Sequence, residues 1–127
     1  MSRYLSIVET AYRATVEEQD DTGVWFTRAI QGAGAEVTLL LRGDGVSYAQ
    51  NGHDARGLSF GTRAVRVAPE LDHDIEAMLA RGSRVLVVNE DLAARGIPDG
   101  TLLSGLERVN RGQVAGILAQ HDRILRF

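Results

Sequence analysis

Apolar residues along the chain fall into short continuous runs that alternate with longer amphipathic stretches. Residues 4–8, 37–41 and 84–88 are mostly apolar. Runs of this kind are typical of strands that are buried on both faces, as in a parallel sheet. Between them, apolar residues recur at helical spacing over 24–33 and 71–79. The pattern therefore predicts strands that alternate with helices.

The last third of the chain continues this alternation. Asn89 directly follows the third apolar run and is predicted to be the N-cap of a helix through Arg95. After it we expect a short strand over 106–109, a helix capped by Asn110 and a final strand over 124–127.

Positions 42–61 interrupt the pattern. They hold five of the fourteen glycines of the chain, which predicts a loop with a short helix around residues 46–50. The remaining order of strands and helices predicts one three-layer α/β/α domain over residues 1–127. Its sheet is expected to be mainly parallel, with about five strands.

In folds of this class, ligands bind beyond the carboxyl ends of the parallel strands. The chain segments at those ends are 10–13, 42–45 and 88–91. Their side chains supply a hydroxyl group, guanidinium groups, carboxylates, an amide and one apolar side chain. The candidate ligand-binding residues are Thr10, Arg13, Arg42, Asp44, Val88, Asn89 and Glu90.

Composition narrows the possible chemistry. The 127 residues include no cysteine, which excludes disulfides, thiolate metal sites and cysteine nucleophiles within this chain. All 14 basic residues are arginine, so lysine Schiff-base chemistry is excluded as well. The formal net charge of −3 gives no reason to expect a nucleic-acid partner. The sequence has no run of 18 apolar residues and no signal-peptide pattern, so we expect a cytoplasmic protein without a membrane span.

Two further features have ordinary structural interpretations. Glu70, His73 and Asp74 share the spacing of one helical face, but an exposed acidic helix start explains them better than a metal site. We expect no metal and no cofactor. Trp25 and Phe26 are consecutive and cannot both face the same way, so we expect one in the core and the other in a subunit contact.

Several segments, taken in order, carry a family resemblance. They are residues 3–8, residues 42–49 with the turn Asp44-Gly45-Val46, residues 85–97 ending in Arg95-Gly96-Ile97, and the terminal 121–127. In this order and spacing the chain resembles the DsrE/DsrF-like family of small sulfur-relay proteins. The segment 85–97 is the most specific part, because the family has a strand, a site residue, a helical turn and Arg-Gly at this spacing.

The resemblance implies a compact α/β domain that assembles with copies of itself or with related sister subunits. It also implies transfer of persulfide sulfur between partner proteins, with a sulfurtransferase as a possible partner. Active members carry a cysteine at the end of the strand, eight residues before the glycine of Arg-Gly. In this sequence that position is Val88, which has no nucleophile.

Three functions remain open. The first, which we favour, is a non-catalytic family member that acts as a structural, regulatory or small-ligand-binding subunit. The second is a non-covalent enzyme that uses Asp44, Glu90 or Asp91 as an acid or base. The third is an anion- or nucleotide-binding module, with the backbone amides after Val88 and the side chain of Arg42 or Arg13 as donors.

Overall fold

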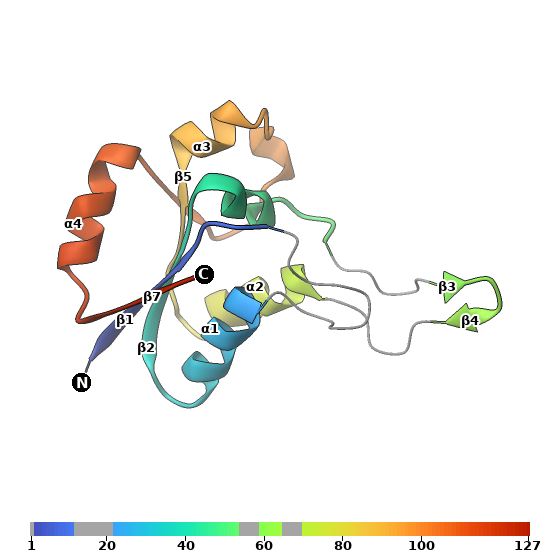
Figure 1. Cartoon of the computed structure of the whole chain (residues 1–127), viewed down its shortest axis with the longest axis horizontal. Coiled ribbons are helices and arrows are strands. Elements are labelled where there is room, and N and C mark those ends of the chain that lie inside the picture. The colour runs from blue at the N-terminus through green and yellow to red at the C-terminus, as the bar shows by residue number, and fades with distance from the viewer. Residues whose placement is uncertain (1, 12–21, 54–58, 65–69) are drawn as a thin grey trace.

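The computed structural model describes residues 2–11, 22–53, 59–64 and 70–127. Its main sheet has five strands in the order β6-β5-β2-β1-β7, and every neighbouring pair is parallel. Figure 1 shows this sheet through the middle of the molecule. The strands are β1 (Arg3–Val8), β2 (Glu36–Leu41), β5 (Val85–Val88), β6 (Glu107–Val109) and β7 (Arg123–Arg126). The predicted parallel sheet is confirmed.

Helices cover both faces of the sheet, which makes the three predicted layers. The helices α1 (Thr22–Gly32) and α2 (Leu71–Ala80) pack on one face, and α4 (Val114–Ala119) packs on the other (Figure 1). Successive residues of β2 and β5 alternate between the two resulting cores, as side chains of a strand must. Among the described residues, no helix is both long enough and apolar enough to cross a bilayer.

Short helical segments gather at the carboxyl end of the sheet, where the parallel strands finish. They are η1 (Gly43–Ala49), α3 (Asn89–Ala94), η2 (Asp99–Thr101) and η3 (Arg111–Gln113). Asn110 caps η3 in a capping box with Gln113, and η3 runs directly into α4. The predicted cap at Asn110 is therefore confirmed.

A small antiparallel hairpin begins at the end of the predicted loop over 42–61 and extends beyond it. It consists of β3 (Ser59–Phe60) and β4 (Arg63–Ala64), and it projects away from the sheet (Figure 1). The two residues between them begin with Gly61, whose φ of 62° lies in the left-handed region that glycine adopts readily. Strands of two residues have too little alternation to be recognised in a sequence.

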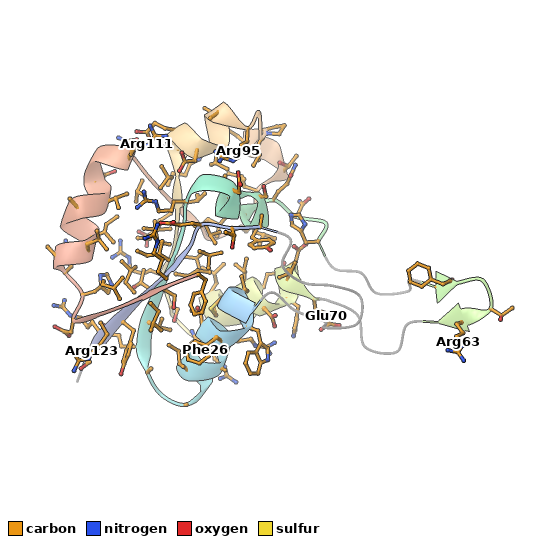
Figure 2. The ribbon with its side chains drawn as sticks, viewed as in Figure 1. Phe26, Arg63, Glu70, Arg95, Arg111 and Arg123 are labelled. Atoms are coloured by element: carbon orange, nitrogen blue, oxygen red, sulfur yellow. The ribbon has the colours of Figure 1, made fainter. Side chains whose placement is uncertain are left out.

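The expectation that one of the two consecutive aromatics packs in the core is wrong. Helix α1 buries Val24 and Thr27 against the sheet, and these residues are one helical turn apart. Trp25 and Phe26 lie between them and remain 53% and 37% exposed. The ring of Phe26 lies 6.0 Å from that of Phe127, and Figure 2 labels Phe26 at α1.

Candidate functional site

A pocket of about 410 Å³ opens at the carboxyl end of the sheet. Residues that end or follow β1, β2, β5 and β6 meet here, because the carboxyl ends of parallel strands lie at one edge of the sheet. Most of its residues follow a strand directly or belong to the short helices found there. The lining of this carboxyl-end pocket is Glu9, Arg42, Gly43, Asp44, Val88, Asp91, Arg95, Arg111 and Val114.

Val88 is the last residue of β5 and supplies part of the apolar lining, together with Val114. It is 1% exposed and belongs to the core on the α4 face. Its side chain offers only methyl groups to a ligand. At this position the pocket can therefore contribute apolar contact but no covalent bond.

A close approach of η1 to the end of β1 shapes one wall of the pocket. A Cβ atom placed on Gly45 would lie 2.0 Å from the carbonyl oxygen of Val8, so this approach requires glycine. The same turn begins at Gly43, whose φ is 56° and whose amide donates to Oδ2 of Asp91 at 2.8 Å. Two glycines thus allow η1 to dock against β1 and α3.

Asp91 connects three segments around the pocket. Its Oδ2 accepts the hydrogen bond from Gly43, and its Oδ1 accepts one from Nη2 of Arg111 at 2.7 Å. Burial alone would raise the pKa of the Asp91 carboxyl, but these two hydrogen bonds and the charges of Arg111 and Arg95 lower it below its usual value. Asp91 is therefore ionised at neutral pH and is poorly suited to act as a general acid or base.

Arg95 is held in place by the turn that carries Asp44. Its Nε and Nη2 both donate to Oδ1 of Asp44, at 3.0 and 2.7 Å. Its Nη1 lies 3.4 Å from the backbone oxygen of Asp91, one helical turn earlier. This ion pair links α3 to η1 along the side of the pocket, and Figure 2 shows Arg95 and Arg111 at the same end of the molecule.

Arg42 is held less tightly than Arg95. Its Nε lies 3.5 Å from Oε1 of Glu9, and the two residues directly follow β2 and β1. The other oxygen of Glu9, Oε2, accepts from Nη2 and Nε of Arg126 at 2.8 and 3.1 Å. Two arginines therefore share one carboxylate.

The predicted helix cap at Asn89 is wrong. Helix α3 begins at Asn89 itself, and its N-cap position is Val88, which has no side-chain cap. The helix starts without a turn after β5, so Asn89 is already helical. Its Nδ2 instead donates to Oδ1 of Asn110 at 3.3 Å.

Glu90 also contacts η3, although its side chain remains exposed to solvent. Both of its carboxylate oxygens accept from the backbone N–H of Arg111, at 2.8 and 3.0 Å. This contact fixes the backbone from which the Arg111 side chain extends. Glu90 thus positions a pocket residue without lining the pocket.

The structure brings three of the candidate residues together. Arg42, Asp44 and Val88 line the pocket, whereas Thr10 is exposed outside it and Asn89 and Glu90 bond to the segment around η3. Arg13 lies outside the described residues. The lining residues absent from the candidate set are Glu9, Gly43, Asp91, Arg95, Arg111 and Val114.

Some of the lining residues that were not among the candidates could have been found from the sequence. Glu9 directly follows β1, Asp91 lies on the helix after β5 and Arg95 follows that helix, so the rule of carboxyl ends applies to all three. Arg111 follows the predicted strand β6, so the same rule could have included it, but its contacts with Asp91 and Glu90 were not visible in the sequence.

In the possible ligand set at the start of α2, Asp74 forms an ion pair with another side chain. Asp74 accepts from the guanidinium of Arg28. Within the described ranges, no group of three histidine or carboxylate side chains is arranged to hold a metal ion.

Comparisons with known proteins agree with this architecture. A model of the DsrE/DsrF-like family matches residues 8–127. Among solved structures, the YchN protein from E. coli is similar with a TM-score of 0.70 and 20% identity, and both chains are covered completely. A protein of unknown function from Methanobacterium thermoautotrophicum, MTH1491, is similar with a TM-score of 0.68 and 14% identity, again over both full lengths. No curated protein matched the chain. Because the family model spans nearly the whole sequence and the fold agrees with it, the chain belongs to the DsrE/DsrF-like family.

Proposed function

We propose that this protein is a non-catalytic subunit of a sulfur-relay-type system that binds a small polar molecule without forming a covalent bond. The observation that carries the proposal is Val88, which occupies the expected cysteine position and lines the carboxyl-end pocket. The pocket has the size of a small-molecule site and a mixed lining of charged and apolar side chains.

Covalent sulfur carriage requires a thiolate, and the sequence contains no cysteine. Acid–base chemistry receives no support from the pocket carboxylates either. Asp91 and Glu9 each bind two partners, and Asp44 is bound to Arg95. These pairs favour a binding site over an active site.

Native mass spectrometry of the protein purified from its own cells tests this proposal. We expect a retained small molecule that separates from the chain on denaturation. A molecule that stays on the denatured chain would contradict non-covalent binding. Recovery of the chain alone, without any ligand, would favour a purely structural subunit.

A cysteine variant tests whether the family chemistry depends on this one position. In Val88→Cys, the new thiolate attacks the outer sulfur of a persulfide donor and releases the donor thiolate. The chain then gains one sulfur atom, about 32 Da, while the wild type gains none. Val85→Cys is the matched control, because Val85 is buried in the same strand at the other end of the sheet. Equal sulfur uptake by both variants would mean that the pocket is not the sulfur site.

We also propose that the protein assembles with copies of itself or with a related sister subunit. Trp25 and Phe26 are exposed on one helix, and Phe127 lies beside Phe26. Exposed aromatic side chains are typical of interfaces. Sedimentation should show an assembly that Trp25→Ser weakens, whereas Phe60→Ser on the hairpin serves as a control for loss of an exposed aromatic ring. A wild-type monomer at micromolar concentration with no recovered partner would contradict the proposal.

A further inference from the structure

Hydrogen-bonding capacity is unevenly distributed around the carboxyl-end pocket. Three arginines and three carboxylates line it, so their formal charges cancel. A guanidinium has five N–H donors, however, and most of those of Arg42 and Arg111 are not used in bonds among the described residues. The pocket therefore has more free donors than a charge count suggests.

Arg42 is the least constrained of the three arginines. Its guanidinium has one ionic contact within the described part of the chain, the 3.5 Å approach of Nε to Glu9. Because Arg126 already binds Glu9 at 2.8 Å, Arg42 can turn toward a ligand without leaving that carboxylate unpaired. Replacing the Arg42–Glu9 contact with a ligand costs little free energy, since that contact is long and partly exposed to water.

Arg111 supplies a second group of N–H donors, and its backbone and side chain are both held in place by hydrogen bonds. Its backbone N–H is held by Glu90, and its Nη2 is held by Asp91. Its Nε and Nη1 make no hydrogen bond within the described residues. A side chain held at these points loses little further freedom when it binds a ligand.

The acceptors of the pocket are mostly occupied. Both carboxylate oxygens of Asp91 and both of Glu9 already interact with N–H donors. Asp44 binds Arg95, and its side chain is otherwise open to water, which screens its charge. A ligand rich in acceptors is therefore favoured over a ligand rich in donors.

From this imbalance we propose that the ligand of the carboxyl-end pocket is a small molecule with an oxyanion group, bound by the side chains of Arg42 and Arg111. The inference rests on the proposed ligand-binding function and adds the chemical class of the ligand. Guanidinium groups bind oxyanions through paired, charge-assisted hydrogen bonds. The pocket volume of about 410 Å³ leaves room for an organic body beyond the anionic group.

Sulfate is a suitable probe for the anionic group. Isothermal titration calorimetry, with ionic strength held constant by chloride, should show binding by the wild type. Arg42→Gln should weaken that binding about tenfold, the effect of losing one charge-assisted hydrogen bond. Arg84→Gln is the matched control, because Arg84 is also an ion-paired arginine but lies at the other end of the sheet. Equal affinity for sulfate in wild type and Arg42→Gln would overturn the proposal.

A second variant should change the affinity for sulfate in the opposite direction. Glu9→Gln removes the carboxylate that competes for Arg42, so sulfate binding should become roughly threefold tighter, in line with the free energy of a partly exposed ion pair. A merely structural role for Glu9 would not strengthen anion binding. Weaker sulfate binding by Glu9→Gln, with the fold intact by circular dichroism, would count against the proposed exchange of Arg42.

Different results would contradict the proposed ligand-binding function and the proposed oxyanion class of the ligand. If native mass spectrometry finds a non-covalent ligand but sulfate neither binds nor displaces it, the oxyanion assignment is wrong and the binding function stands. If no ligand is retained and sulfate does not bind, both are wrong. Displacement of the retained molecule by sulfate in the wild type supports both.

Discussion

Two arginine–glutamate pairs at opposite ends of the sheet have very different geometries. At the amino end, Nε and Nη2 of Arg84 donate to the two carboxylate oxygens of Glu107, at 3.1 and 2.8 Å. The hydrogen bond from Arg84 lowers the pKa of the Glu107 carboxyl. At the carboxyl end, Arg42 approaches Glu9 with Nε alone, at 3.5 Å.

The difference shows how one kind of residue pair can serve two purposes. The guanidinium of Arg84 binds both oxygens of the Glu107 carboxylate, and this bidentate pair connects the start of β5 to the start of β6. Glu9 is shared between Arg42 and Arg126, so guanidinium donors outnumber carboxylate acceptors there. The pair of Arg84 and Glu107 connects two strands, whereas the arrangement around Glu9 leaves N–H donors available to a ligand.

The largest effect is expected when the carboxyl end loses its close packing. In Gly45→Ala, the new methyl group would overlap the carbonyl oxygen of Val8, and η1 would have to move away from β1. We expect a loss of about 3 kcal/mol in the free energy of unfolding, measured by urea denaturation.

Gly116→Ala is the matched control for that substitution. Gly116 is exposed in α4, and a Cβ atom there would meet nothing within 4 Å. The change should stabilise the protein by about 1 kcal/mol through helix propensity. Similar stability of the two alanine variants would disprove the steric role assigned to Gly45.

A smaller effect is expected from Asp91→Asn, which removes a charge but keeps one oxygen acceptor. The amide group cannot accept from both Gly43 and Arg111, so the variant should lose about 2 kcal/mol at neutral pH. Because folding lowers the pKa of Asp91, its ionised form stabilises the native state above about pH 4. That contribution disappears as the pH falls through the lowered pKa.

The difference in stability between wild type and Asp91→Asn should therefore shrink in acid. Urea titrations at several pH values between neutrality and acid measure it. A difference that stays constant over this range would show that the charge of Asp91 contributes nothing, and that the substitution acts through shape alone.

The smallest effects on stability concern the two pairs themselves. Arg84→Gln should cost about 0.5 kcal/mol, because the pair is well formed but about half exposed to water. Arg42→Gln should cost less than Arg84→Gln, since its contact is longer and Arg126 keeps Glu9 paired. A larger loss of stability for Arg42→Gln would reverse the comparison and assign the carboxyl-end pair a structural role.

Much of the fold was predictable from local patterns. The apolar runs specified the buried parallel strands, and helical spacing located α1, α2 and α4, because strand and helix periodicities reflect which positions face a core. The position of Val88 at the end of a strand placed it at the carboxyl end of the sheet. The hairpin β3–β4 was missed because its strands are too short to form a pattern.

By itself the sequence determined the parallel three-layer fold, the absence of a thiol and the identity of Arg42, Asp44 and Val88 as candidates. It did not determine that Arg111 joins Asp91, or that Glu9 is divided between two arginines. Those contacts join residues that are 20 to 117 positions apart in the chain. Only the tertiary structure decides them, because the partner of a long charged side chain depends on which strand ends the sheet order brings together.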